Sequence, residues 1–371
     1  MATEERGELT PMRPKRDFAQ LPLLANEPSL RPPPSTRYQG SKFKLLDWIW
    51  DNLRTLEFDT ALDGFGGTGS VAYVLKAHDK AVTYNDYLRF NHLVGIALIE
   101  NQDTPLSAED VSKILSRDRN ALYDNLIATI FDGIYFTEEE NAWLDVTCQN
   151  ILQIGDRYKN ALAYYALFQS CIAKRPYNLF HRKNLYMRLA EVRRSFGNKA
   201  TWDTPFEDHF RGFVAEANAS VFSSRKRCEA LCCDVVQVPG SFDLVYLDPP
   251  YVNSRGSTVD YRDFYHFLEG LVIYNDWREE IDHSKKHLPL KASHSRWSDP
   301  KQIRAAFAEC FERYSESIIV LSYGNKGIPG VEELTKLLKR YKEHVVVIEQ
   351  PDYKYVLSID DSTKELLFIA W

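Results

Sequence analysis

Six short apolar runs, separated by stretches of helical character, constrain the fold of this chain more than any other feature. None of them is longer than a β-strand, and helical periodicity lies between several of them, for instance from Val331 to Tyr341. Strands that alternate with helices are typical of a mostly parallel sheet covered by helices, so the predicted class is α/β. The predicted strands are Ala61–Leu62, Ala81–Tyr84, Phe242–Leu247, Ile318–Ser322, Val345–Ile348 and Leu366–Trp371.

Changes in composition and periodicity divide the 371 residues into four segments. Residues 1–36 hold seven of the 17 prolines and show no periodicity, which predicts a flexible proline-rich tail. Residues 37–90 are expected to form the first part of the sheet domain, beginning with an amphipathic helix from Phe43 to Leu53. Residues 91–225 are mainly helical and increasingly basic, so we interpret them as an insertion, and residues 226–371 as the second part of the sheet domain.

Composition excludes several classes of protein. Hydrophobic residues make up 44% and charged residues 26%, and no apolar run approaches the roughly 20 residues of a membrane-spanning helix, so we expect no membrane role. The first residues lack an apolar signal core, which favours a cytoplasmic location. The six cysteines match no paired zinc pattern, and no metal site is predicted. A net charge of −6 counts mildly against nucleic acid as a partner unless positive charge gathers on one face.

A glycine-rich turn follows the first apolar run. The segment Asp63–Ser70 contains Phe65, Gly67, Thr68 and Gly69 and precedes an apolar helical stretch, so strand, turn and helix appear in order. Glycines allow a tight turn and a close approach of backbone to a ligand, and the helix start offers free N–H groups. On its own the turn could serve a dinucleotide, a phosphate or only the fold.

An acid ends the second apolar run. Asp86 lies 17 residues beyond Gly69, at the predicted carboxyl end of a strand. Acids in this position commonly bind ribose hydroxyls, although a helix cap or a turn residue would look the same in sequence. Together with the glycine turn, Asp86 favours a cofactor that contains adenosine.

The most informative segment is the strand Phe242–Leu247 followed by Asp248, Pro249, Pro250 and Tyr251. Ligands of open α/β sheets bind outside the carboxyl ends of the strands, where this tetrapeptide and the glycine turn would both lie. The residue types suit attack by a base amine, whose lone pair is delocalised into its ring. Asp248 and the carbonyl of Pro249 can each accept one amine hydrogen, the prolines stiffen the loop, and Tyr251 offers a flat face to an extruded base.

These segments resemble the Dam-type, or alpha, group of DNA adenine methyltransferases, which includes restriction-modification enzymes, and the resemblance covers most of residues 37–371. The Asp248–Tyr251 segment matches the catalytic motif of that family, and residues 37–42 match its amino-terminal cofactor motif. The resemblance implies a Rossmann-like fold and transfer of a methyl group from S-adenosylmethionine to N6 of adenine in a short duplex DNA target. The cofactor-binding residues that it implies are Tyr38, Lys42, Asp63, Phe65, Gly67, Thr68, Gly69, Asp86, Asp234 and Asp248.

The architecture of the family also implies that residues 91–225 read the DNA target. The stretch from Lys174 to Lys199 holds eight basic residues against one acid, Glu191, with aromatic residues between them. A solvated helix face would show the same charge run, but beside the catalytic motif we favour contact with double-stranded DNA. The resemblance also allows functional pairing with a restriction endonuclease. The predicted DNA-binding residues are Lys174, Arg175, Arg182, Lys183 and Arg188.

Two alternatives stay open at this stage. A methyltransferase acting on a base amine of structured RNA uses the same tetrapeptide, and a non-catalytic protein could keep the cofactor pocket and only bind DNA. Transfer to cytosine C5 is disfavoured because it needs an attacking thiolate, typically in a Pro-Cys pair, and the sequence contains none. The segments Tyr265–Glu269 and Leu321–Asn325 also resemble the family, but we expect His266 to be structural and assign neither segment a catalytic role.

Overall fold

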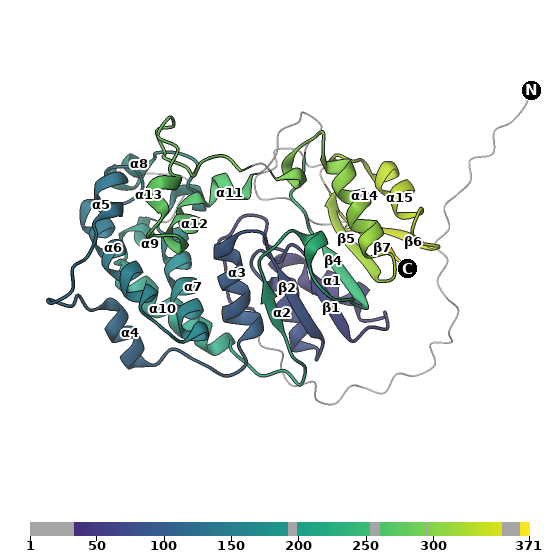
Figure 1. Cartoon of the computed structure of the whole chain (residues 1–371), viewed down its shortest axis with the longest axis horizontal. Coiled ribbons are helices and arrows are strands. Elements are labelled where there is room, and N and C mark those ends of the chain that lie inside the picture. Colours follow the sequence, from purple (N-terminus) through teal and green to yellow (C-terminus); the bar gives the residue numbers. More distant parts are fainter. Residues whose placement is uncertain (1–32, 192–198, 253–259, 294, 351–363) are drawn as a thin grey trace, which may run out of the picture. The chain divides into compact units, whose positions relative to one another are not determined.

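A seven-stranded sheet forms the centre of the computed structural model, which describes residues 33–191, 199–252, 260–293, 295–350 and 364–371 (Figure 1). The strand order is β3-β2-β1-β4-β5-β7-β6, and pairing is parallel from β3 to β5, whereas β7 runs antiparallel to both of its neighbours. The predicted α/β class is therefore confirmed. The strands are β1 (Thr60–Asp63), β2 (Ala81–Asn85), β3 (Glu229–Leu231), β4 (Leu244–Leu247), β5 (Ile318–Gly324), β6 (Val345–Glu349) and β7 (Glu365–Ala370).

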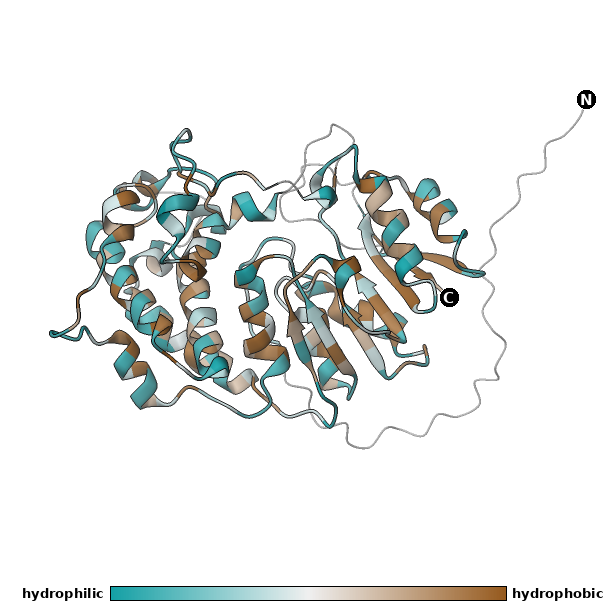
Figure 2. Cartoon of the chain, viewed as in Figure 1, coloured by the Kyte–Doolittle hydropathy of each residue, from teal (hydrophilic) through white to brown (hydrophobic). Residues whose placement is uncertain are grey.

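Side chains on the two faces of the sheet enter separate hydrophobic cores. Alternate residues of a strand point to opposite faces, so Leu244 and Tyr246 of β4 join one core, and Val245 and Leu247 join the other. The first core also contains residues of α1 (Leu46–Leu53), α2 (Ser70–Ala77) and α3 (Arg89–Gly95), and the second those of α14 (Ile303–Arg313) and α15 (Val331–Leu338). Figure 2 shows the strands coloured largely as hydrophobic between helices of mixed colour. The sheet is thus covered on both faces.

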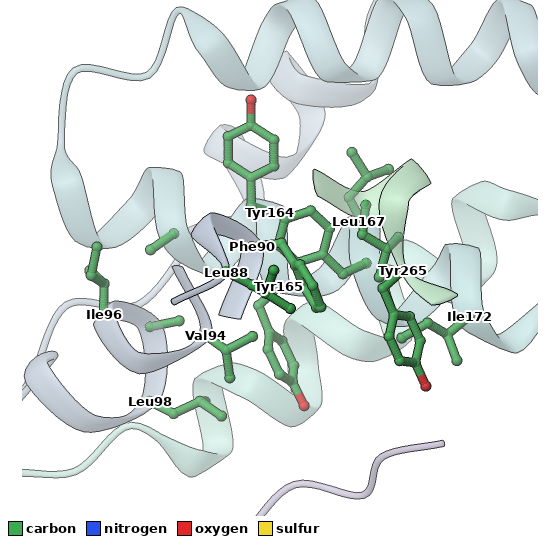
Figure 3. Packing of buried hydrophobic residues seen from close by; sticks show 14 of the residues in the cluster. Leu88, Phe90, Val94, Ile96, Leu98, Tyr164, Tyr165, Leu167, Ile172 and Tyr265 are labelled. Carbon is green, nitrogen blue, oxygen red and sulfur yellow. The ribbon is translucent and has the colours of Figure 1, made fainter. Parts of the chain in front are cut away.

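Helices between β2 and β3 extend the first core away from the sheet. The chain passes from α3 through a π-helical turn, η2 (Ile96–Glu100), and returns to α3 through the long helix α7 (Arg157–Ala173). Figure 3 shows Phe90 and Val94 of α3 close to Tyr165 of α7, and the rings of Phe90 and Phe168 meet edge to face at 5.7 Å. The remaining helices of this region are α4 (Ala108–Leu115), α5 (Leu126–Ile130), α6 (Glu138–Leu152), η3 (Pro176–Asn178), α8 (Leu185–Leu189), α9 (Lys199–Asp203) and α10 (Phe206–Ser220).

Two helices that follow β4 join this helical region. Rings of α12 (His266–Val272) and α13 (Trp277–Glu280) pack on Phe131, at 5.2 Å for Phe267 and 4.9 Å for Trp277. A Cβ at Gly270 would lie 1.9 Å from the indole of Trp277, so only glycine fits there. The division into residues 37–90, 91–225 and 226–371 remains a prediction, and the packing adds that the helical region draws on the third segment as well as the second.

The predicted helix from Phe43 to Leu53 is present, with its first turn in 3-10 form as η1 (Phe43–Leu45) and the rest as α1. The predicted tail falls mostly outside the described residues, but Ser35 and Thr36 contact Glu216 of α10 and Gln169 of α7 through hydrogen bonds. No described helix combines the length and the hydropathy needed to span a bilayer. The remaining short elements are η4 (Val235–Gln237), η5 (Arg296–Ser298) and α11 (Tyr261–Phe264).

Candidate active site

A cavity of about 900 Å³ opens at the carboxyl ends of the parallel strands. Strands β1, β2 and β4 are neighbours in the sheet, so the loops that follow them meet at one edge. Every predicted catalytic and cofactor residue except Gly69 lines this cavity. Gly69 instead precedes the first residue of α2 with a φ of +71°, in the left-handed region that favours glycine, and so it shapes the turn.

The glycine turn leaves space for a ligand. A Cβ at Gly66 would lie 2.0 Å from the ring of Tyr84, so backbone and ring are in close contact there. Gly67 has a φ of +51°, and a Cβ there would meet only the carbonyl oxygen of Phe65, at 3.9 Å. The side of the turn that faces the cavity is thus open backbone, which fits the close approach of a nucleoside cofactor.

Asp86 both supports the glycine turn and lines the cavity, two roles that the sequence could not distinguish. Its carboxylate accepts hydrogen bonds from the backbone N–H groups of Gly67 and Leu88, both at 2.8 Å, and from the amide of Asn91 at 3.1 Å. Burial raises the pKa of Asp86 to about 6, and these hydrogen bonds oppose that rise. Asp86 therefore braces the glycine turn while lining the cavity, so the turn-residue interpretation and the ribose-binding interpretation are compatible.

Aromatic rings and a salt bridge form the flanks of the cavity. The ring of Tyr38 stacks on that of Tyr265, with centroids 4.4 Å apart, and also on that of Tyr261 at 5.7 Å. On the other flank, Asp234 accepts a hydrogen bond of 3.1 Å from Arg296, and the ring of Trp297 meets that of Phe65 edge to face at 4.9 Å. Sequence reasoning missed Tyr261, Arg296 and Trp297, because they lie in segments without a strand-end motif.

The predicted catalytic motif, Asp248–Tyr251, lies within a cluster of charged side chains. Lys42 places its Nζ 2.8 Å from Oδ1 of Asp248 and 3.0 Å from the hydroxyl of Tyr251. Oε1 of Glu365 lies 2.7 Å from that hydroxyl and Oδ1 of Asp248 lies 3.1 Å from it, so its single proton can be donated to either carboxylate. Glu365, at the start of β7, is fully buried and accepts a hydrogen bond from Ser322 as well. Neither Glu365 nor Ser322 was identified as a site residue from the sequence.

Burial decides the protonation of the acids in this cluster. It raises the pKa of Asp248 to about 6, because the lowering by Lys42 is partly cancelled by the negative charge of Glu365. Burial, reinforced by repulsion from Asp248, raises the pKa of Asp63 to about 8. Of the two acids, Asp248 is therefore the one that ionises more readily and can accept hydrogen bonds, and Asp63 holds its proton to higher pH.

Three of the five residues predicted to bind DNA are wrong, because their side chains are buried. Lys174, Arg175 and Arg188 expose only 2%, 1% and 5% of their surface. Lys174 and Arg188 form ion pairs with Glu140 of α6, at 2.9 and 2.6 Å. Arg175 donates to the backbone carbonyl oxygens of Tyr135, Leu179 and Arg182 and to the side chain of Asn184. These cations hold the helical region together and cannot reach a phosphate.

The loop that Arg175 braces does present residues to solvent. Arg182 and Lys183 are exposed, and their contact with DNA stays a prediction. Tyr177 and Asn178 both have positive φ, +62° and +59°, which is rare for residues other than glycine, and both line the cavity. Tyr177 is 53% exposed. Two such residues at the rim of a site point to a functional loop, and its signal in the sequence was limited to the local run of basic and aromatic residues.

In the first of the two weaker segments, Tyr265–Glu269, the contacts of His266 and Glu269 are structural. His266 is fully buried, lies 2.8 Å from the hydroxyl of Tyr135, and has a pKa that burial lowers to about 3. Glu269 accepts hydrogen bonds of 3.1 Å from the backbone N–H groups of Arg89 and Phe90, and so it caps the start of α3. The expectation that His266 is a structural histidine is confirmed.

Comparison with known proteins agrees with this arrangement. The model of the D12 class N6 adenine-specific DNA methyltransferase family matches residues 38–320. The type II methyltransferase M2.HphI of Haemophilus parahaemolyticus is 30% identical over 91% of this chain and 97% of its own length. The modification methylase LlaI of Lactococcus lactis subsp. lactis is 23% identical over 88% of this chain, and the type II methyltransferase M.FokI of Planomicrobium okeanokoites is 25% identical over 89% of it. This chain spans about half the length of each of these two relatives, 52% and 51%.

Proposed function

This chain belongs to the D12 class N6 adenine-specific DNA methyltransferase family, and on that premise we propose that it takes its methyl group from S-adenosylmethionine bound in the cavity at the ends of β1, β2 and β4. Membership favours DNA over RNA as substrate and an active enzyme over a protein that only binds DNA. Assignment to the Dam-type subgroup stays a prediction. The observation that carries the proposal is that the open glycine turn and the Asp248–Tyr251 motif line one cavity.

The proposed reaction needs the amine of adenine to be gripped and aligned. When bound, S-adenosylmethionine supplies a sulfonium methyl group, and the electron pair of the broken carbon–sulfur bond stays on sulfur. Asp248 and the carbonyl of Pro249 accept the two amine hydrogens, which directs the nitrogen lone pair toward the methyl carbon. As the new carbon–nitrogen bond forms, the nitrogen becomes positive and gives up one proton, which Asp248 is placed to accept. The ring of Tyr251, held edge to face on Tyr323 at 4.9 Å, offers the base a stacking surface.

The depth of the Asp248–Tyr251 motif supports extrusion of the target adenine from the duplex. The side chain of Asp248 is only 17% exposed, too deep for a base that is still stacked in a double helix. We therefore propose base extrusion into the cavity, past the rim that carries Tyr177. The exposed Arg182 and Lys183, on the same loop, would bind the phosphates that flank the target.

The relatives suggest a setting for this activity. They are named type II methyltransferases and modification methylases, so we propose that the enzyme protects DNA against a restriction endonuclease of the same specificity. A substrate of cellular DNA also favours action in the cytoplasm.

One experiment tests both product and target. The protein is expressed in a host that lacks adenine methylation, and the host DNA is sequenced by a method that detects N6-methyladenine. We expect methylated adenines within one short motif, and none in a matched culture that expresses Asp248→Ala. Modified cytosine, or adenine methylation found only in RNA, would refute the proposal.

A further inference from the structure

A second carboxylate lies beside the catalytic motif and has no role in the mechanism above. Glu365 is the first residue of β7, pairs in register with Gly324 of β5, and is fully buried. It lies beyond residue 320, where the match to the family model ends. A buried carboxylate is costly unless charged or polar groups compensate it, so its presence at this point requires an explanation.

Glu365 and Asp248 contact the same two hydrogen-bond donors, Lys42 and Tyr251. Oδ1 of Asp248 accepts from the ammonium of Lys42 at 2.8 Å and is within hydrogen-bond distance, 3.1 Å, of the hydroxyl of Tyr251. Oε1 of Glu365 is 2.7 Å from the same hydroxyl and 3.4 Å from the same ammonium. Two donors are therefore shared between two carboxylates, and the distances from a donor to the two acceptors differ by only 0.6 Å for the ammonium (3.4 against 2.8 Å) and 0.4 Å for the hydroxyl (3.1 against 2.7 Å).

This sharing matters because the target amine must also bind to Asp248. A carboxylate that already holds an ammonium and a hydroxyl on one oxygen attracts a further donor less strongly, since its charge is partly neutralised. A group that draws these donors away at the moment of binding would restore the charge of Asp248. Among the residues that the structure describes, Glu365 is the carboxylate other than Asp248 that contacts both donors.

We propose that Glu365 is a positioning residue that takes over Lys42 and the Tyr251 hydroxyl when adenine enters, so that Asp248 is free to hold the amine. The inference rests on the proposed function of Asp248 in gripping that amine. When Glu365 and Asp248 are both ionised beside Lys42, the cluster carries an excess negative charge, which favours the positive charge that develops on the attacking nitrogen.

The pH dependence of the rate provides a readout that a purely structural role would not change. Because the negative charge of Glu365 raises the pKa of Asp248, removing that charge lowers it, and the acid limb of the rate profile moves to lower pH. The other titratable groups that face Asp248 stay in place in such a variant. They are Lys42 from the amino-terminal segment, Asp63 of β1, Tyr246 of β4 and Tyr251 of the motif.

The test compares Glu365→Gln and Glu365→Asp with the wild type, using the full chain, S-adenosylmethionine and DNA that contains the target. For Glu365→Gln we expect kcat to fall about tenfold or more, with less than about a twofold change in KM for S-adenosylmethionine. Its acid limb should move down by about half a pH unit or more. Glu365→Asp keeps the charge, so its acid limb should stay at the pH of the wild type, and it should recover much of kcat.

A matched control is Glu349→Gln on the neighbouring strand β6, where the carboxylate is exposed and pairs with Lys364. This variant should match the wild type in rate and in profile. If Glu365→Gln does not fold, Ser322→Ala replaces it, because it removes one hydrogen bond to Glu365 and leaves the charge. Weaker positioning of Glu365 should then lower kcat with little change in the acid limb.

Two outcomes would overturn the inference. One is a Glu365→Gln enzyme with the rate and the profile of the wild type, and the other is an equal loss of rate in Glu365→Gln and Glu365→Asp with no movement of either acid limb. Failure of the underlying mechanism is recognised separately, because Asp248→Asn would then keep near-normal activity whatever the Glu365 variants do.

Discussion

The strand-end cavity and the basic helical segment were both predicted from local sequence, yet the structure treats them differently. At the strand ends, twelve of thirteen predicted residues line one cavity, whereas in the helical segment three of five predicted DNA contacts are buried. A motif that directly follows a strand is placed by the topology of the sheet. A run of charges on helices is not placed by anything local, because the face that it occupies depends on packing with distant residues such as Glu140.

The largest expected effect tests the strand-end half of this comparison. Asp248→Ala should lower methyl transfer about a thousandfold or more, since it removes the acceptor that aligns the amine. The fold should persist, because the variant removes a buried carboxylate whose pKa is already raised. Methyl incorporation into DNA, with circular dichroism as the control for folding, measures both. A rate close to that of the wild type would show that the cavity was misinterpreted.

Arg175→Ala tests the helical half, and its effect should fall on stability. Removing this guanidinium leaves several buried carbonyl oxygens without a donor, which should cost about 3 kcal/mol or more. Thermal unfolding should show a clear loss, whereas Lys183→Ala, on the exposed part of the same loop, should change stability by less than about 0.5 kcal/mol. If Arg175→Ala instead weakens DNA binding at unchanged stability, the distinction between the two regions fails.

The pH dependence of the methylation rate tests the role of Asp248 in the strand-end cavity. Asp248 has to be ionised to accept the amine, and its pKa is raised to about 6. The rate should therefore be flat above about pH 7 and fall about tenfold for each pH unit below 6. The free energy of unfolding should change with pH in the opposite direction to the rate. A carboxyl group whose pKa is raised by folding stabilises the folded state at low pH, and this contribution is lost as pH rises through 6. A rate that stays flat down to pH 5 would exclude Asp248 as the controlling group.

The smallest expected effect tests whether the exposed basic residues of the helical segment bind DNA. The double variant Arg182→Ala, Lys183→Ala should weaken DNA binding about tenfold and reduce the slope of log affinity against log salt concentration by up to about 2, at nearly unchanged stability. Titration of labelled duplex at several salt concentrations measures both quantities. An unchanged slope would mean that neither side chain contacts a phosphate.

The features that escaped prediction share a physical reason. Strand β3 is only three residues long, from Glu229 to Leu231, so it forms no apolar run. The direction of β7 cannot be deduced from its composition, because parallel and antiparallel strands in a buried sheet have the same apolar side chains. An acid before an apolar run, such as Glu365, looks like an ordinary turn residue until the partner strand is known. Six strands, and the position of Asp248–Tyr251 at a strand end, were predictable because each depends only on neighbouring residues.

The late position of β7 in the chain has a consequence for synthesis in the cell. Strand β7 fits between β5 and β6, although it is translated after both of them. While the ribosome is still adding residues before 365, β5 has an unpaired edge and β6 has no partner in the sheet, so the nascent polypeptide exposes a surface prone to aggregation. Under the role proposed for Glu365, the Asp248–Tyr251 loop also lacks its neighbouring carboxylate until β7 is in place.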